Sequence, residues 1–407
     1  MTHSGGPVSE HPGPGPSSPR IELNGVAMPI ADQLAVIASD GSVTALDAAG
    51  RRLWEALQAG CAVDDLVAAS VREGCLREEV ARANISQTLA VWRRLRLIGA
   101  AACPAPEPHS VPVASPVVAR PIGRTPELDA VYLPGDRKVR IRCDDPVVAG
   151  VIEAACRSCR LEDTGGTHPV VDLVEQDGWF GVNSDQSELT RADDLTTNRA
   201  LARHRCLTML LEASRQPRRW LGILHASAAA GGGRCVVFAG AKGSGKSTLT
   251  AALTAAGLDF VTDDYAPLER ATWQIWPVPY APGIKQGSWR ALQRHCPDIY
   301  ERPVHRLAGL RIRYLDLDAR RRAPLDRGLP VAALVFPRYE AGCDLKERRL
   351  TAAEALTALC QARSLLDRQL DVFAETLRWI AEVPAYRLTY GELDPAIEWT
   401  HSLLSAA

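Results

Sequence analysis

Nine consecutive residues near the middle of the chain have the pattern of a phosphate-binding loop. They are Gly240, Ala241, Lys242, Gly243, Ser244, Gly245, Lys246, Ser247 and Thr248. Glycines let backbone N–H groups turn inward around phosphate oxygens. The lysine of such a loop reaches the outer phosphates, and the serine that follows it reaches a magnesium ion. We therefore expect all nine residues to bind a nucleoside triphosphate, with Lys246 on the phosphates and Ser247 on Mg²⁺.

The residues on either side of the loop supply the expected context. Residues 235–239 predict a short buried strand, and residues 247–256 predict a helix that Gly257 closes. A strand, a glycine-rich loop and a helix in this order distinguish a binding site from a chance glycine-rich turn. The start of the helix would add its partial positive charge to the site.

Two neighbouring carboxylates follow the next predicted strand. Asp263 and Asp264 follow the largely apolar run 258–261, after Thr262. If this strand lies beside the loop strand, both acids stand at the C-terminal edge of the sheet, near the phosphates. A carboxylate there can hold magnesium or accept a proton from an attacking hydroxyl. The alternative is a helix cap or a solvated turn, and chemistry alone does not divide the roles between the two acids.

A histidine ends another predicted strand. His225 follows residues 221–224, and we expect the chain to return through a loop at 231–233 into the strand before the glycine-rich loop. This hairpin would place His225 beside the start of the loop helix. A single histidine is more often structural than catalytic, so spacing alone leaves both interpretations open.

These motifs together resemble the HPr kinase/phosphorylase family. The resemblance rests on Leu224-His225-Ala226, on the loop Gly240–Ser247 and on the pair Asp263-Asp264, in the family's order and spacing. It extends over roughly residues 131–400 and is strongest over 221–268. One departure is Ala241, where the family has an acidic residue after the first loop glycine.

The resemblance implies a serine-directed kinase that uses ATP and Mg²⁺. It implies that Asp264 accepts the proton of the substrate hydroxyl and that His225 supports catalysis. By the same resemblance, Ser247 and Asp263 are the metal ligands and Lys246 contacts the phosphates. Arg338, after the predicted strand 332–336, is in the place of the family's catalytic arginine, although a surface arginine is an equal alternative. Lys285, in a predicted loop near the site, is a further candidate.

An independent set of elements is predicted over residues 26–102. Residues 34–38 and 43–46 indicate two strands around a turn, and a helix should run from Asp47 to Gly60. Apolar residues at 63–67 mark a second helix, and residues 78–97 a third that Gly99 ends. This pattern is similar to that of the PqqD family, small winged-helix-like α+β modules that recognise leader peptides of ribosomally made natural products.

The second resemblance implies a peptide partner. In that family a leader peptide adds as a strand to the edge of the small sheet and lays apolar side chains against the third helix. Here the edge would be residues 43–46 and the helix face would lie within 79–95. The alternative is that the apolar residues of this helix simply form the core.

The remaining segments complete the predicted organisation. Residues 1–25 are expected to be a disordered tail and 103–127 an extended proline-rich linker. Residues 128–407 are expected to form an α/β P-loop domain of the HPr kinase type with a small N-terminal α+β subdomain. Its C-terminal part, 351–403, should be mostly helical.

Composition excludes some classes of function. The net charge of −1 argues against nucleic-acid binding driven by bulk electrostatics. No apolar run reaches the length of a membrane span, and no export signal is visible, so we expect a cytoplasmic protein without a membrane partner. The 11 cysteines are scattered, which favours free thiols.

The two resemblances together predict a peptide-tailoring kinase. The first module would hold a precursor peptide by its leader while the second phosphorylates a Ser or Thr hydroxyl. Two alternatives stay open, namely a kinase of a small molecule and a non-catalytic, nucleotide-dependent peptide-binding chaperone. HPr kinases form hexamers, and the resemblance leaves a homo-oligomer open.

Overall fold

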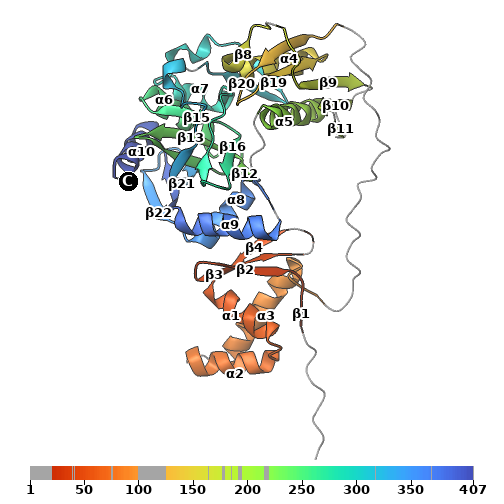
Figure 1. Ribbon diagram of the computed structural model, residues 1–407. Helices are drawn as coiled ribbons and strands as arrows, with labels where there is room; N and C mark the ends of the chain where they lie inside the picture. The colour runs from red at the N-terminus through yellow and green to blue at the C-terminus, as the bar shows by residue number, and fades with distance from the viewer. Residues whose placement is uncertain are drawn as a thin grey trace, which may run out of the picture. The chain divides into compact units, whose positions relative to one another are not determined.

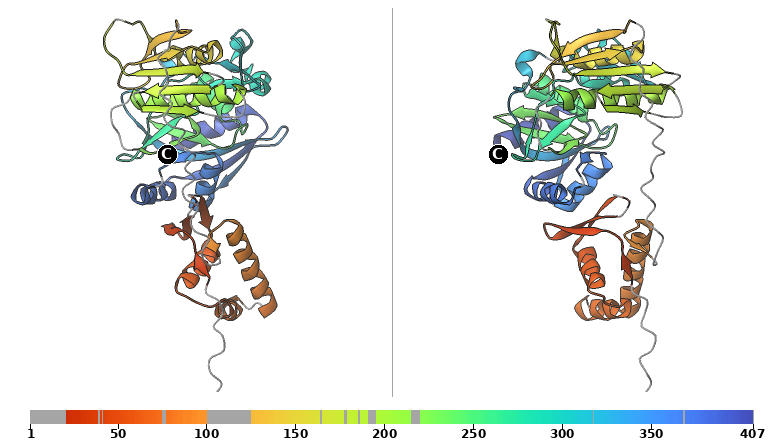
Figure 2. Two further views of the ribbon diagram at one scale, coloured as in Figure 1. Left: turned by 90° about the vertical axis from the view of Figure 1, so that its right-hand side faces the viewer. Right: turned by 45° about the vertical axis from the view of Figure 1, so that its right-hand side comes forward.

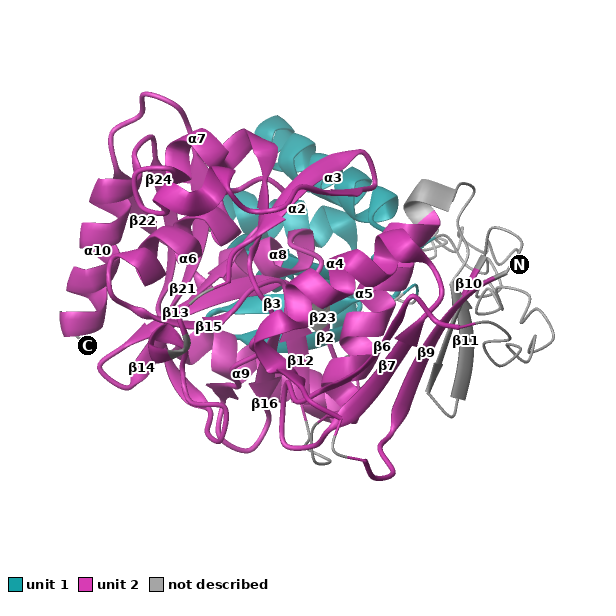
Figure 3. Ribbon diagram, turned by 90° about the horizontal axis from the view of Figure 1, so that it is seen from above, with its two compact units in different colours: residues 1–108 teal, residues 109–407 magenta. Residues whose placement is uncertain are grey.

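The computed structural model describes residues 21–38, 40, 42–74, 77–99, 125–163, 165–176, 179–184, 186–190, 195–214, 220–316, 318–367 and 369–406. The chain divides into two compact units, residues 1–108 and 109–407, which Figure 3 colours separately. The predicted tail up to residue 20 and most of the predicted linker, up to residue 124, lie outside the described residues.

Unit 1 contains a three-stranded antiparallel sheet and three helices (Figure 1). Its strands, in sheet order, are β2 (Val26–Ile30), β3 (Gln33–Ile37) and β4 (Val43–Leu46). Its helices are α1 (Ala48–Gln58), α2 (Val63–Gly74) and α3 (Glu78–Arg94). These elements confirm the two strands and three helices predicted from the sequence.

Local capping and apolar spacing explain why unit 1 forms these elements. The Asp47 carboxylate accepts a hydrogen bond of 2.7 Å from the Gly50 N–H and so caps the start of α1. Trp54 of α1 and Trp92 of α3 are both buried, with ring centroids 5.7 Å apart. Helical spacing brings Ile85, Leu89 and Trp92 onto the face of α3 that packs into this core.

Two sequence predictions in unit 1 are wrong in detail. α3 ends at Arg94, not near Gly99, because the chain turns at Arg96, which has a left-handed φ of 56°. The chain then continues as β5 (Ile98–Gly99), which pairs with β1 (Glu22–Leu23). The last residues of the predicted tail are therefore strand, because pairing with β5 satisfies their backbone groups.

Unit 2 begins with a six-stranded sheet covered by two helices. The sheet order is β11-β10-β9-β7-β6-β8. The strands are β6 (Leu128–Tyr132), β7 (Val139–Cys143), β8 (Arg160–Leu161), β9 (Val170–Gln176), β10 (Trp179–Ser184) and β11 (Gln186–Thr190). The helices are α4 (Pro146–Cys156) and α5 (Leu195–Ala213), and the short helix η1 (Arg157–Cys159) follows α4.

The rest of unit 2 is built on a ten-stranded sheet. Its main path is β15-β13-β14-β21-β17-β16-β12-β23, and β24 joins β21 and β22. The strands are β12 (Trp220–Leu224), β13 (Ala226–Gly231), β14 (Arg234–Ala239), β15 (Asp259–Thr262), β16 (Ala266–Glu269), β17 (Gln274–Ile275), β21 (Leu329–Tyr339), β22 (Lys346–Arg349), β23 (Leu365–Leu366) and β24 (Ala385–Tyr390).

Helices and a small three-stranded sheet surround the large sheet. The helices are α6 (Lys246–Ala255), α7 (Trp289–Leu292), α8 (Ala352–Gln361), α9 (Leu370–Glu382) and α10 (Leu393–Ala406), with short helices η2 (Gln286–Ser288), η3 (Pro297–Tyr300) and η4 (Ala319–Arg321). The small sheet has the order β18-β20-β19, from β18 (Gly283–Lys285), β19 (His305–Leu307) and β20 (Leu310–Tyr314).

The two large sheets of unit 2 occupy its opposite ends. The six-stranded sheet with α4 and α5 lies at one end and the ten-stranded sheet at the other, as the views in Figures 1 and 2 agree. Leu249 and Leu253 of α6 share a core with Val236 of β14, Val335 of β21 and Ala396 of α10. The fold is thus mixed α/β. The helix α6, which follows the glycine-rich loop, packs against one face of the large sheet.

Several strands of the large sheet, β13 and β24 among them, were not predicted from the sequence. Residues 226–231 form β13 rather than a loop, and residues 385–390 form β24 within the segment predicted as mostly helical. The strand β13 consists of Ala, Ser and Gly, which are not typical strand formers. The small side chains let α6 pack closely, as the 2.6 Å contact of the Ser227 and Thr250 hydroxyls shows. Among the described helices none is long and apolar enough to cross a bilayer.

Candidate functional site

Four strands of the large sheet run in the same direction and end at one edge. β14 pairs parallel with β21, and β21 with β24. β15 has the direction of β14 because each pairs antiparallel with β13 between them. The glycine-rich loop after β14, the acid pair after β15 and the last residues of β21 and β24 therefore meet at this edge. His225 precedes the antiparallel β13 and lies at the same edge.

The glycine-rich loop depends on backbone conformations that favour glycine. Gly243 and Gly245 have left-handed φ values of 89° and 99°. Gly245 is also the N-cap of α6, and a Cβ added to it would stand 2.5 Å from the hydroxyl oxygen of the buried Tyr390. Only glycine satisfies both conditions, and the N–H groups of the first turn of α6 remain directed toward the loop.

Lys246 is folded back over the loop. Its side chain is buried, and the Nζ ammonium donates hydrogen bonds to the Gly240 and Ala241 carbonyl oxygens, at 2.7 and 3.3 Å. Burial lowers the pKa of the ammonium, an effect that the neighbouring acids oppose. The group is thus held at the loop, where phosphate oxygens are the natural partners of its charge. Ala241, Lys242 and Gly243 are exposed at the tip of the loop.

Asp263 is the buried member of the acid pair. Its carboxylate accepts a hydrogen bond of 2.9 Å from the Ser247 hydroxyl. Burial, with the adjacent charge of Asp264, raises the pKa of Asp263 to about 7. The Ser247 and Asp263 oxygens are hard donors of the kind that Mg²⁺ prefers, and nucleotide phosphates commonly supply further ligands. The two residues present therefore fit a magnesium ion that is shared with a nucleotide.

Asp264 is held differently, although it is the next residue. Its side chain is 37% exposed, and its oxygens lie 3.5 Å from His225 Nε2 and 3.6 Å from Arg203 Nη1. Partial burial alone would raise the pKa of this carboxyl, but the His225 contact and the charge of Arg203 outweigh it and hold the pKa well below its usual range. The Asp264 backbone is left-handed, with a φ of 66°, a strained conformation of the type that occurs at functional sites.

His225 is oriented by the segment that follows α8. Its Nδ1 lies 2.8 Å from the Ala362 carbonyl oxygen, and because a carbonyl only accepts, Nδ1 carries the hydrogen. Its backbone N–H donates to the Ser364 hydroxyl at 3.2 Å. The imidazole is therefore fixed with Nε2 facing Asp264.

Arg203 belongs to the site but was not predicted from the sequence. It lies on α5, which packs on the six-stranded sheet, and its side chain is only 17% exposed. Its Nε has no hydrogen-bond partner within the described part of the chain. The sequence nevertheless contained a signal for this residue. Arg203 stands at helical spacing with the buried Cys206, Leu207 and Leu210. A charged residue on an apolar helix stripe is unusual unless it has a partner.

Lys285 lies near the acid pair, as expected, but on a strand. It ends β18, which pairs with β20, so the predicted loop is wrong at this point. The N–H of Gly283 on the same strand donates to the Asp263 carboxylate, and the positive charge of Lys285 adds to those that lower the pKa of Asp264. The small sheet thus closes one side of the acid pair.

Arg338 does not join this cluster. It lies near the end of β21, at the correct edge, but its guanidinium is 62% exposed and pairs with Glu340 at 3.0 Å. Within the described residues no contact supports the catalytic role that the sequence suggested. That role stays a prediction without structural support.

Unit 1 contains a large hollow beside an exposed sheet edge. In the order β2-β3-β4, β4 is an edge strand. A hollow of about 1060 Å³ lies against it, lined by residues of β4, α1, α2 and α3. Val91 of α3 and Leu95, which follows α3, line it and are 39% and 41% exposed, whereas Ile85 and Trp92 line it from the core. This is the edge and the helix face that the sequence predicted for peptide binding.

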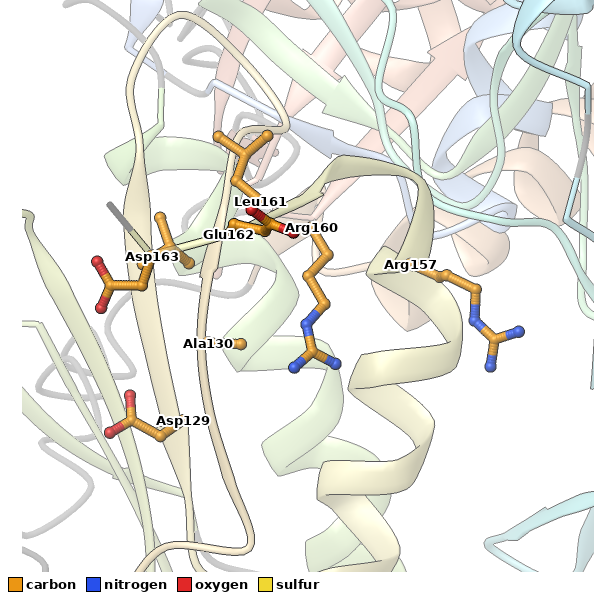
Figure 4. A pocket seen from close by; sticks show the side chains of 8 residues that line it. Asp129, Ala130, Arg157, Arg160, Leu161, Glu162 and Asp163 are labelled. Atoms are coloured by element: carbon orange, nitrogen blue, oxygen red, sulfur yellow. The ribbon is translucent and has the colours of Figure 1, made fainter. Parts of the chain in front are cut away.

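A second hollow, on the six-stranded sheet, is charged. It has a volume of about 530 Å³ and is lined by residues of β6, η1 and β8. Figure 4 shows Asp129 and Asp163 on one side and Arg157 and Arg160 on the other. Asp129 and Asp163 both pair with Arg140, and Arg160 pairs with Glu153, so these three charges already have partners on the protein surface.

Comparison with known proteins adds no assignment. No model of a known protein family matches the chain, and no curated protein is similar to it.

The geometry of Gly245 leads to a stability test. Gly245→Ala should destabilise the protein more than Gly243→Ala, since both positions are left-handed but only Gly245 has an atom within reach of the new methyl group. Backbone strain of this kind costs on the order of 1–3 kcal/mol, and the clash adds to it at Gly245 alone. Thermal or urea unfolding measures both variants. Adding Tyr390→Phe to Gly245→Ala should recover part of the difference, and equal losses at both glycines would contradict this account of the loop.

Proposed function

We propose that the chain is an ATP-dependent kinase that phosphorylates a Ser or Thr hydroxyl of a ribosomally made precursor peptide. The observation that carries this proposal is the grouping of Lys246, Ser247, Asp263, Asp264 and His225 at one sheet edge, around a loop with the backbone of a phosphate-binding site. The resemblance to HPr kinase noted in the sequence assigns the same residues to phosphoryl transfer.

The loop and α6 would bind the triphosphate. The backbone N–H groups around Gly243 and Gly245 and the first turn of α6 would donate to phosphate oxygens. Lys246 would exchange its loop carbonyl partners for the outer phosphates. Ser247 and Asp263 would hold Mg²⁺, which when bound neutralises charge on the phosphates.

Asp264 would receive the acceptor hydroxyl. With its low pKa the carboxylate is ionised at neutral pH, so it can accept a hydrogen bond from the hydroxyl and hold its oxygen toward the phosphoryl group. A carboxylate of low pKa is a weak base. That is compatible with a loose transition state, in which the hydroxyl proton moves late and positioning supplies most of the acceleration.

Arg203 and His225 would hold Asp264 in place. Both contact its oxygens, from α5 and from the turn before β13, and both contacts favour the ionised carboxylate. Because the backbone of Asp264 is strained, such contacts are needed to keep the carboxylate in one orientation. We assign them as positioning residues.

Unit 1 would capture the peptide. The edge of β4 offers unpaired backbone groups, and the hollow beside it offers the apolar side chains of Val91 and Leu95. An extended peptide could add as a strand and bury alternate side chains in this hollow. Holding the leader on the same chain as the active site would raise the effective concentration of the residue to be modified.

The compartment is also part of the proposal. The cysteines in the described part of the chain are free thiols, and several of them are buried in cores. Thiols stay reduced in the cytoplasm, where a precursor peptide and ATP are both present.

The acid assignment gives the first test. Asp264→Asn should abolish phosphate transfer and leave nucleotide binding nearly unchanged, because the amide cannot accept the proton. Intact-mass analysis of a candidate precursor, encoded by neighbouring genes, after incubation with protein, ATP and Mg²⁺ measures the transfer. Asp259→Asn, at the opposite end of the same strand β15, is the matched control and should stay active. Transfer that survives Asp264→Asn would refute the assignment, and failure of the unmodified protein on every precursor would favour the small-molecule or chaperone alternatives.

The positioning role of Arg203 gives the second test. Arg203→Met should lower kcat by about a hundredfold, at the lower end of general acid–base effects, while KM for ATP stays the same. Arg203→Lys should restore part of the rate. Arg199→Met removes the ion pair to Asp145 from the same helix and should lower stability but not kcat. If both arginine variants lose kcat in proportion to stability, Arg203 is only structural.

The hollow beside β4 gives the third test. Val91→Asp places a charge where apolar side chains of the leader should bind, so KM for a full-length precursor should rise about tenfold or more, while the reaction of the core peptide alone is unchanged. Val80→Asp is the matched control, since Val80 is 45% exposed on α3, close to the 39% of Val91, but lies outside the hollow. The same KM for both variants would exclude capture of the leader by this hollow.

A further inference from the structure

A half-exposed tyrosine flanks the glycine-rich loop. Tyr339 is the last residue of β21 and is 50% exposed. Its Cβ lies 3.8 Å from the position that a Cβ on Gly245 would take. Its ring meets the buried Tyr390 edge to face, with centroids 6.0 Å apart and planes at 68°. An aromatic side chain is therefore held at the loop by a second one, and half of its surface remains open to solvent.

The alternation of β21 explains why Tyr339, and not Arg338, flanks the loop. Val335 packs in the core with Leu249 of α6. Side chains two and four residues apart on a strand share a face, so Tyr339 has the orientation of Val335, toward α6 and the loop that precedes it. Arg338 leaves the strand on the opposite face and pairs with Glu340.

The loop separates Tyr339 from the acid pair. On the β15 side, Ser247 is hydrogen-bonded to Asp263. On the β21 side, a Cβ on Gly240 would lie 3.9 Å from the Pro337 carbonyl oxygen, and Gly245 adjoins Tyr339 and Tyr390. A triphosphate whose terminal phosphate faces Asp264 must extend across the loop, and its nucleoside end then leaves on the β21 side.

We propose that Tyr339 is the platform on which the base of the nucleotide stacks. The inference rests on the proposed nucleotide site but goes beyond it, since it assigns the base subsite. Every base has a π face, so stacking on a tyrosine discriminates little between bases. The site should therefore take ATP and GTP with similar affinity, the purines having the larger stacking area.

Binding measurements on the full-length protein test the proposal. Calorimetry gives Kd for MgATP, MgGTP and magnesium triphosphate without a nucleoside. Tyr339→Ala should weaken both nucleotides about tenfold, in the range of single-base stacking, and leave inorganic triphosphate unchanged. Tyr339→Trp should retain nucleotide affinity. Tyr300→Ala is the matched control, because Tyr300 is 46% exposed but packs against Trp289 and Arg313 rather than Tyr390.

The outcomes separate this inference from the proposed function. Unchanged nucleotide affinity in Tyr339→Ala, or an equal loss for inorganic triphosphate, would overturn the base platform while leaving the phosphate site intact. A preference of the unmodified protein for ATP over GTP by about a hundredfold would also overturn it, because stacking cannot supply such discrimination. An unmodified protein that binds no nucleotide would refute the proposed function together with the platform.

Discussion

The candidate site depends on one constraint, namely that four strands of the large sheet run in the same direction. Their C-terminal ends therefore lie together. β13 lies between β14 and β15 and pairs antiparallel with both, so the loop and the acid pair end at the same edge, two strand spacings apart. Two spacings amount to roughly 10 Å, which leaves room for a phosphate group between them. The same strand begins beside His225. A strand made of Ala, Ser and Gly thus sets both the distance across the site and the place of its histidine.

Two adjacent carboxylates differ because their surroundings differ. Asp263 is buried beneath Ser247, and burial and the neighbouring charge disfavour its ionised form. Asp264 is strained and partly exposed, but Arg203 and His225 favour its ionised form. Neighbouring acids whose pKa values are pushed apart are suited to separate roles. Asp263 accepts a hydrogen bond from Ser247, whereas Asp264 contacts Arg203 and His225. In the proposed function, Asp263 would act on the metal side and Asp264 on the acceptor side.

The helix α3 of unit 1 shows how one amphipathic helix can serve a core and a surface. Ile85, Leu89 and Trp92 are buried against the sheet and α1, which accounts for the stability of the unit. Val91 and Leu95 face the hollow beside β4 and stay exposed. All five side chains are apolar, and only the packing of α1 and β4 around them separates the core residues from those that face the hollow.

The sequence by itself determined what depends on neighbouring residues. It was sufficient to predict the strand, loop and helix around Lys246, the helix that begins after Asp47, and several strands of each unit, because capping, turns and periodicity act over a few residues. Tertiary structure decided what depends on distant ones. It made β13 a strand, brought Arg203 of α5 to Asp264 and set Tyr339 beside Gly245. These contacts join elements far apart in the chain, and their geometry arises only when the sheets and helices pack, which no local pattern encodes.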